Sequence, residues 1–313
     1  MKLEIVFRSF LFFVIVVPLG ACSVPWPGER TQVFPTLLPL MSPKAPPTVV
    51  QTITPLLITS QIPGERKTST MKTPVDVLRI TIVYDNNPFD PRLTTSWGFS
   101  ALVEYGDQIL LFDTGGDRRI LLENMQVLGI DPARIQSIVL SHAHGDHTGG
   151  LSALLNGGDQ PSVYLLPSFA DAYKNQVMQV TQVSEVTPGQ VIGNGILTTG
   201  EIDGKIPEQA LVIRTSDGLV VITGCAHPGI VRIIERAMEL TGDPVYLVLG
   251  GFHLGNKNKT EISAILADFR RLGVQKVAPC HCSGELAIAM FAADYEQAFI
   301  QAGVGTVITL EGQ

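Results

Sequence analysis

The 313-residue sequence predicts a domain of the α+β class over residues 75–313, with two mixed β-sheets flanked by helices. The order of its segments indicates this: strand pairs typical of hairpins come early in each half, and strands alternating with helices come later. Histidine supports the same architecture, because all six histidines follow predicted strands, where α/β proteins gather their ligands. This length is ample for a hydrophobic core.

Alternation of apolar and polar residues predicts the strands of the first half. A tight turn at Gly106-Asp107 joins two of them into a hairpin. Helical spacing ends at Gly129, and Asp131-Pro132 fits the start of a further helical turn. The expected strands are 75–86, the two halves of 99–116, 136–141 and 161–167, and the expected helices are 118–130 and 149–155.

The second half repeats this arrangement. It begins with a hairpin over 208–224 that turns at Asp217-Gly218. An amphipathic helix over 228–242 follows, begun by a proline and ended by a glycine. The remaining strands are expected at 244–251, 275–280 and 304–310, and the remaining helices at 260–273 and 285–303.

The first 22 residues are typical of an export signal. Lys2 and Arg8 precede an apolar run over 9–19, which is too short to span a bilayer comfortably and fits a signal peptide. Leu19-Gly20-Ala21-Cys22 resembles the bacterial lipobox, so we expect an exported lipoprotein, lipidated at Cys22 and anchored on the extracytoplasmic side of a membrane. A plain signal peptide, or an anchor helix with a chance cysteine, is the alternative.

Composition separates a tether from the folded region. Residues 23–74 contain ten prolines and nine threonines, which favours extended chain over a packed core. Before residue 75 there are seven Lys/Arg against three Asp/Glu, and from there on fifteen against twenty-six. A folded region this acidic argues against nucleic acid as a partner. It is still compatible with a small anionic substrate, because a bound metal ion reverses the local electrostatic potential.

Residues 141–150, SHAHGDHTGG, gather three of the six histidines beside an aspartate. His142 and His144 leave a strand, so their side chains point to the same side and can hold one cation. Asp146 and His147 then offer a second set of ligands. Four such ligands exceed what one ion needs, which predicts two divalent ions, Zn²⁺ first, with Fe or Mn as alternatives. The alternative is a solvent-exposed loop whose polar residues cap the following helix and bind no metal.

The run His142-Ala143-His144-Gly145-Asp146-His147 matches the HxHxDH signature of the metallo-β-lactamase superfamily. The resemblance covers most of 75–313 and implies an αββα sandwich with two metal sites between its sheets. It also implies that Asp113, in LLFDTGG at 110–116, supports the metal loop without binding metal. A turn residue after a strand is the alternative for Asp113.

The resemblance assigns ligands in the second half as well. His281 matches the family's late histidine, a ligand of the second ion, and Cys225 stands where the family has a bridging aspartate. A thiolate can bridge two ions. No histidine between 148 and 226 matches the family's intermediate ligand of the first ion. His227, from a shifted position, is expected to supply it, with Glu201 as a weaker choice, unless that site is incomplete.

Three further motifs, TGCAHPG, GGFHL and PCHCSG, resemble one branch of the superfamily. It is the branch of 7,8-dihydropterin-6-methyl-4-(β-D-ribofuranosyl)aminobenzene-5′-phosphate synthase-like proteins. We expect this chain to resemble that branch, but we do not carry over its substrate, because an exported lipoprotein is an unusual place for pterin biosynthesis. If Cys22 carries lipid, three cysteines remain and cannot all pair. Cys280 and Cys282 are too close for an unstrained bridge, so metal ligation or burial is expected for them.

These observations predict a metal-dependent hydrolase whose metal-activated water attacks a small ester, lactone or phosphoester. The ions lower the pKa of a bound water from 15.7 toward roughly 7. By the resemblance, Asp146 binds an ion and orients the nucleophile, and His253 is expected to hydrogen-bond the substrate or an oxyanion. An iron-dependent redox enzyme of the same fold and a non-catalytic metal-binding surface lipoprotein are the alternatives.

Overall fold

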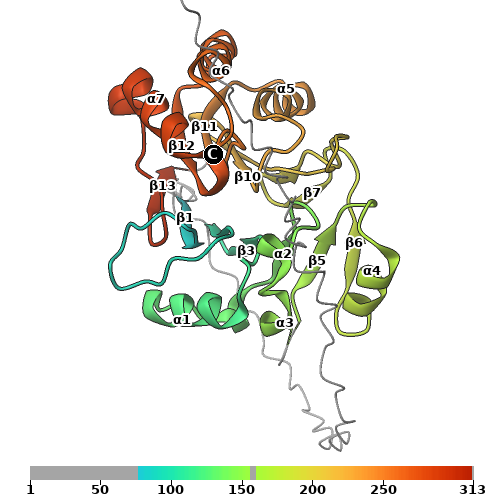
Figure 1. The fold of residues 1–313 in the computed structure, drawn as a ribbon. Helices are drawn as coiled ribbons and strands as arrows, with labels where there is room; N and C mark the ends of the chain where they lie inside the picture. Colours follow the sequence, from blue (N-terminus) through green and yellow to red (C-terminus); the bar gives the residue numbers. More distant parts are fainter. Residues whose placement is uncertain (1–76, 156–159, 312–313) are drawn as a thin grey trace, which may run out of the picture. The chain divides into compact units, whose positions relative to one another are not determined.

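Two mixed β-sheets form the centre of the region that the structure describes, residues 77–155 and 160–311 of a computed structural model (Figure 1). The first sheet has seven strands in the order β13 (Val307–Glu311), β1 (Val77–Tyr84), β2 (Ser100–Tyr105), β3 (Gln108–Phe112), β4 (Ser137–Val139), β5 (Ser162–Leu165) and β6 (Val183–Glu185). The second has six, in the order β12 (Lys276–Cys280), β11 (Val245–Gly251), β10 (Gly218–Thr223), β9 (Leu211–Thr215), β8 (Ile196–Thr198) and β7 (Val191–Gly193). The prediction of two mixed sheets is confirmed.

Each sheet joins antiparallel strands to parallel ones. In the first sheet β1, β2 and β3 pair antiparallel, and β3 through β6 pair parallel. In the second, β7 through β10 pair antiparallel, and β10, β11 and β12 pair parallel. Parallel neighbours end at the same edge of a sheet, so the residues that follow β3 and β4, and those that follow β10, β11 and β12, come together.

Helices cover the outer face of each sheet. On the first sheet, Leu121 of α1 and Leu151 of α3 share a buried cluster with Leu111 of β3. A second cluster joins the helices α5, α6 and α7 to β10 and β11 through buried aromatic and aliphatic side chains. The helices are α1 (Arg118–Leu128), α2 (Gly145–Thr148), α3 (Leu151–Leu154), α4 (Asp171–Met178), α5 (Ile230–Thr241), α6 (Lys259–Arg271) and α7 (Glu285–Tyr295).

A third cluster lies between the sheets. Ile80 of β1 and Val103 of β2 pack there with Val220 of β10 and Leu247 of β11, all of them fully buried. Val221, the next residue of β10, belongs to the cluster under the helices, as the period of two in a strand requires. The layers therefore run helix, sheet, sheet, helix, and the predicted αββα sandwich is confirmed.

Two parts of the chain differ from the prediction. The helix expected over 285–303 ends at Tyr295, because Glu296 has a φ of 48° and the chain then joins the edge of β12, where the Ile300 amide donates to the Val277 carbonyl. The helix α4 and the strands β6, β7 and β8 lie in a stretch where no element was expected. These strands have three residues each, which is too few to show a period of two.

The predicted signal peptide, the lipidation site Cys22 and the tether over 23–74 lie outside the described residues. Across 77–155 and 160–311, no helix combines the length and apolar character that a membrane span needs.

Candidate metal centre

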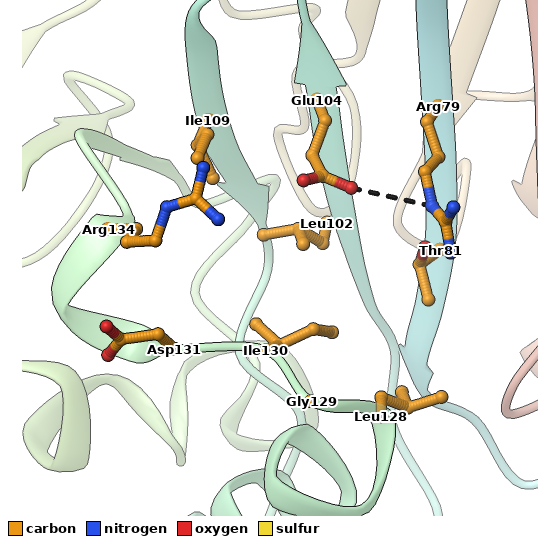
Figure 2. A pocket seen from close by; sticks show the side chains of 10 residues that line it. All are labelled: Arg79, Thr81, Leu102, Glu104, Ile109, Leu128, Gly129, Ile130, Asp131 and Arg134. Carbon is orange, nitrogen blue, oxygen red and sulfur yellow. Dashed lines mark ion pairs between the residues drawn. The ribbon is translucent and has the colours of Figure 1, made fainter.

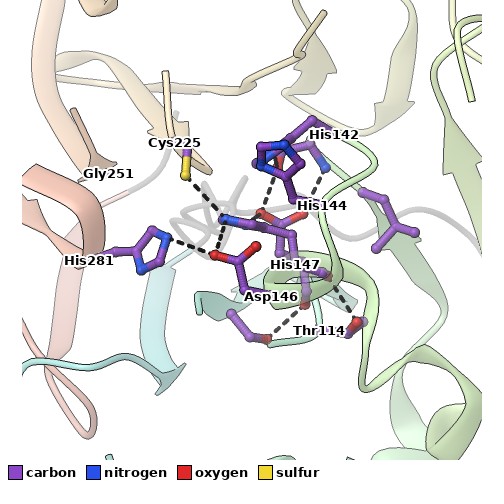
Figure 3. A network of polar contacts seen from close by, with 12 residues as sticks. Thr114, His142, His144, Asp146, His147, Cys225, Gly251 and His281 are labelled. Carbon is purple, nitrogen blue, oxygen red and sulfur yellow. Dashed lines mark hydrogen bonds and ion pairs between the residues drawn. The ribbon is translucent and has the colours of Figure 1, made fainter. Parts of the chain in front are cut away.

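The site residues predicted from the folded region gather at the carboxyl ends of strands from both sheets (Figure 3). Asp113 follows β3, the run that begins at His142 follows β4, Cys225 and His227 follow β10, His253 follows β11 and His281 follows β12. Apart from that of Asp113, their side chains belong to overlapping groups, and the potential ligand atoms within each group lie within 4.8 Å of one another. The convergence expected from parallel strand ends is therefore present.

The first group consists of His142, His144 and His227. His142 Nε2 lies 3.1 Å from His144 Nδ1, and the rings of His144 and His227 are 4.8 Å apart. His227 thus stands where the third ligand of the first ion was missing. Glu201, the weaker choice, accepts a hydrogen bond from the Ser168 amide and lies in none of the groups found in the described chain.

The second group consists of Asp146, His147 and His281. Asp146 Oδ2 lies 3.5 Å from His147 Nε2 and 3.5 Å from His281 Nε2. The short helix α2 presents Asp146 and His147, and Thr114 fixes it, since both its amide and its hydroxyl donate to the His147 carbonyl. Two nitrogens and one carboxylate oxygen form a ligand set that suits Zn²⁺, Fe or Mn.

Cys225 lies between these two groups. It forms a third group with His142 and His147, one member of each, and its Sγ is 3.3 Å from His147 Nε2. A single thiolate in this position is within reach of both candidate ion positions. Cys225 would therefore be available to an ion held by either group, and its bridging role stays a prediction.

Neighbouring side chains hold the histidines in orientation. Asp113 Oδ2 lies 2.7 Å from His147 Nδ1 and accepts the Ser141 hydroxyl at 2.7 Å, and this hydroxyl lies 2.8 Å from His142 Nδ1. Gly224 makes the close approach possible, because a Cβ there would lie 2.2 Å from Ser141 Oγ. His142 and His147 thus each have one ring nitrogen engaged and the other turned to the groups, the arrangement of ligand histidines in metalloproteins.

Asn86 supports His281 in the same way. Its Oδ1 lies 2.8 Å from His281 Nδ1, and its Nδ2 donates to the His281 carbonyl. His281 Nε2 and His227 Nε2 are buried without a hydrogen-bond partner among the described residues. Buried polar atoms are normally satisfied, so two unsatisfied nitrogens that face other ligands are what a cation site requires. The residues present therefore fit divalent metal ions.

We expect Asp113→Asn to lower metal affinity about 10–100-fold, because one of its two accepting oxygens becomes an amide nitrogen that cannot accept from His147 or Ser141. Competition with a chromophoric chelator would measure the affinity. Asp117→Asn is the control, since Asp117 lies in the same segment and only caps α1. An unchanged metal affinity in Asp113→Asn would show that Asp113 is only a turn residue after a strand.

Glu208 is a site residue that the sequence reasoning missed. It is fully buried, and its carboxylate accepts hydrogen bonds from the amides of Cys225, Ala226 and His227 at 2.8, 2.9 and 2.8 Å. It thereby holds the turn that presents both ligands, in which Ala226 has a φ of 61°. Burial raises the pKa of Glu208 to about 7, against the effect of these amides. The one sequence signal for this role was an acidic residue just before a buried strand, because buried acidic side chains are rare unless they have a charge or hydrogen-bond partner.

Burial and mutual proximity set the charges of the ligands. Burial and the neighbouring histidines, among them His253, lower the pKa of His227 to about 3, and burial with His147 holds the pKa of His142 well below its usual value. Both rings are therefore neutral at pH 7, the form that binds metal. Burial opposes charge on Asp146, but His281 and His147 hold its pKa well below the usual value, so it is an anion.

Two side chains stand at the open side of the site. The His253 ring is exposed and lies 4.3 Å from that of His227, and Trp97 is 59% exposed with its ring 4.9 Å from that of His281. The hydrogen bonds on either side of Trp97, from Ser96 to Asp85 and from Phe99 to Asp146, fix its segment against the site. A substrate would thus meet an imidazole and an indole first.

A separate hollow lies on the outer face of the first sheet (Figure 2). It is lined by residues of β1, β2 and β3 and of the segment after α1, including the ion pair Arg79–Glu104 at 3.5 Å. None of the residues of the three groups lines this hollow, so it is not part of the metal centre.

Comparison with known proteins gives a family match. Residues 98–231 match the family model described as the metallo-beta-lactamase superfamily. A protein of Methanocaldococcus jannaschii named 7,8-dihydropterin-6-methyl-4-(beta-D-ribofuranosyl)-aminobenzene-5′-phosphate synthase is 28% identical over 289 aligned residues, which cover 75% of this chain and 97% of that protein. The predicted resemblance to this branch is thereby confirmed.

Solved structures show the same likeness. One, described as a metal-dependent hydrolase of the beta-lactamase superfamily, is 29% identical, covers 75% of this chain and 99% of its own, and has a TM-score of 0.64. A metallo-beta-lactamase fold protein from Bacillus subtilis is 17% identical with the same coverage and a TM-score of 0.55, a likeness of fold alone. Both likenesses agree with the sandwich described above.

Proposed function

Because this chain has the metallo-β-lactamase fold and matches the model of that superfamily, we propose that it is a metal-dependent hydrolase of small esters, lactones or phosphoesters. One observation carries the proposal. Cys225 lies between the group of His142, His144 and His227 and the group of Asp146, His147 and His281, so two ions would be held side by side. His144 and Asp146 are only partly buried, so a small substrate would have access to this pair.

Divalent ions bound there would supply hydroxide at neutral pH and polarise a carbonyl or phosphoryl oxygen. Asp146, anionic and partly exposed, is placed to orient the attacking water. Glu208 and Asp113 hold the ligands in position through the amides of the turn at Cys225 and through the His147 ring. His253 is exposed beside His227 and would be placed to donate a hydrogen bond to negative charge that develops on the substrate.

Metal analysis combined with a hydrolase panel tests this function. The purified full chain is assayed with bis(p-nitrophenyl) phosphate, p-nitrophenyl acetate and a homoserine lactone. Phosphoesters come first, because the name of the archaeal relative is that of a synthase whose product bears a phosphate. We expect turnover that chelation removes and Zn²⁺, Mn²⁺ or Fe²⁺ restores.

The same experiment separates the alternatives. Two irons, no zinc and no hydrolysis would instead favour a redox enzyme of the same fold. Tight reversible metal binding without turnover on any substrate would favour a metal-binding protein that is not an enzyme.

We also propose that the protein is displayed outside the cytoplasm as a lipoprotein attached through Cys22. The lipobox-like Leu19-Gly20-Ala21-Cys22 and the short apolar run before it support this. In a fractionation of expressing cells, Cys22→Ser should move the protein from the membrane fraction to the soluble exported fraction. Unchanged membrane association of that variant would count against lipidation.

A further inference from the structure

A second sulfur lies next to the bridging position. Cys225, Cys282 and His253 form a group whose ligand atoms are within 4.8 Å of one another, and Cys282 Sγ lies 3.5 Å from the Cys225 carbonyl oxygen. All three cysteines of the described chain are free thiols. The predicted hydrolytic site makes use of Cys225 but has no role for Cys282.

We propose that Cys225, Cys282 and His253 form a third metal seat, which takes a thiophilic divalent ion. The seat shares only Cys225 with the two groups described above. Two thiolates and one imidazole make a softer set than the nitrogen and carboxylate ligands of those groups, and soft ligands select Zn²⁺ and Cd²⁺ over Mg²⁺ or Mn²⁺. Three protein ligands leave a fourth position open in a tetrahedral ion.

The backbone around Cys282 is shaped for this contact. Gly251, at the end of β11, has no side chain, and a Cβ there would lie 2.7 Å from Cys282 Sγ and 3.2 Å from the Cys225 Cα (Figure 3 shows Gly251 beside Cys225). The Phe252 amide donates to Ser283 Oγ at 3.0 Å and ties the segment after β11 to the turn that carries Cys282. The thiol thus occupies space that only a glycine leaves open.

His253 completes the seat in an uncommon backbone conformation. Its φ of 55° lies in the left-handed region, which residues other than glycine rarely adopt and which is found where a site requires it. The residues on either side, Phe252 and Leu254, are buried while His253 is exposed. The conformation therefore turns this one side chain out of the core and toward the sulfur atoms, at the open side of the site.

Cys280 provides the contrast. It lies two residues before Cys282, but it is fully buried in the core between the sheets and belongs to none of the groups that could hold an ion in the described chain. The two cysteines of the PCHCSG motif are thus separated by the turn after β12, one into the core and one toward the site. Cys280→Ala is therefore a matched control for Cys282→Ala.

Binding of Cd²⁺ and Co²⁺ to the metal-stripped full chain, under a reductant, tests the proposal. Equilibrium dialysis gives the ions bound per chain, and thiolate-to-metal charge-transfer absorption reports on sulfur ligands. We expect Cys282→Ala to lose one ion per chain and to lower the charge-transfer absorption roughly twofold, because one of two thiolates is removed. Cys280→Ala should match the wild type in both measurements.

His253→Ala removes an exposed ligand and is a second test that does not depend on core packing. We expect the last ion to bind at least about tenfold more weakly in this variant, with the charge-transfer absorption preserved at saturating Cd²⁺. Cys282→Ala with wild-type stoichiometry and absorption would overturn the proposal. Neither measurement reads hydrolysis, so a chain that binds the third ion and turns over no substrate would refute only the proposed function.

Discussion

Replacing His142 and His144 together with alanine should remove one ion per chain and lower hydrolytic turnover by on the order of 10³-fold or more, because the first ion loses two of its three histidine ligands and the supply of hydroxide fails. His281→Ala should remove the other ion, since His281 belongs to the second group alone. Element analysis after dialysis, with the turnover measured on the same sample, checks both expectations.

The two variants together test how the ligands are divided. If the groups are independent, each variant retains one of these two ions, and the variant with all three substitutions retains neither of the two. Far-ultraviolet circular dichroism controls for folding. Full stoichiometry in His142→Ala/His144→Ala would show that these histidines are not ligands, and the hydrolase proposal would then lose its basis.

Glu208→Ala should lower the free energy of unfolding of the metal-free protein by about 3 kcal/mol, because three buried amides lose their acceptor and each loss costs about 1 kcal/mol or more. Metal affinity should fall as well, since Cys225 and His227 lie on the released turn. Denaturant unfolding and chelator competition measure the two effects. Glu201→Ala is the matched control, and its change should stay within about 0.5 kcal/mol.

The pKa of Glu208 gives this effect a pH dependence. It is raised from its usual 4.5 to about 7 in the folded protein, so folding favours the protonated carboxyl. The stability that Glu208 adds is therefore fully present below pH 4.5 and declines as the pH rises through about 7. The gap between wild type and Glu208→Ala should thus be larger at about pH 6 than at about pH 8. A gap that widens with pH would show that the carboxylate itself is the stabilising form.

Much of the fold follows from local pattern. Long strands such as β1 and β11 alternate or run apolar over several residues, and α1 ends at Gly129, whose φ of 70° shows why a glycine stands there. The strands β6 to β8 were missed because each has only three residues, and pairing with a neighbouring strand, more than their own residues, makes them strands. The end of α7 was missed for the same reason, since contact with β12 interrupts a sequence with good helical propensity.

The site was predictable where its residues are chemically distinctive. Histidine and cysteine are scarce in this chain and stand at strand ends, so they could be singled out before their distances were known. Asn86 and Glu208 could not, because their types are common and their roles depend on packing against His281 and the turn at Cys225. The place of His227 depends on the left-handed backbone of Ala226, which no local pattern indicates.

The two groups at the metal centre also tie the sheets together. His142, His144, Asp146 and His147 follow β4 of the first sheet, whereas His227 and His281 follow β10 and β12 of the second. Each ion would therefore cross-link the two layers and close a loop through much of the domain. The segment after β4 offers only two ligands to either ion, His142 with His144 or Asp146 with His147, so firm metal capture waits until β10 and β12 are in place. Metal retention would then report that folding is complete. Removal of the ions should make the packing between the two sheets the least stable part of the domain.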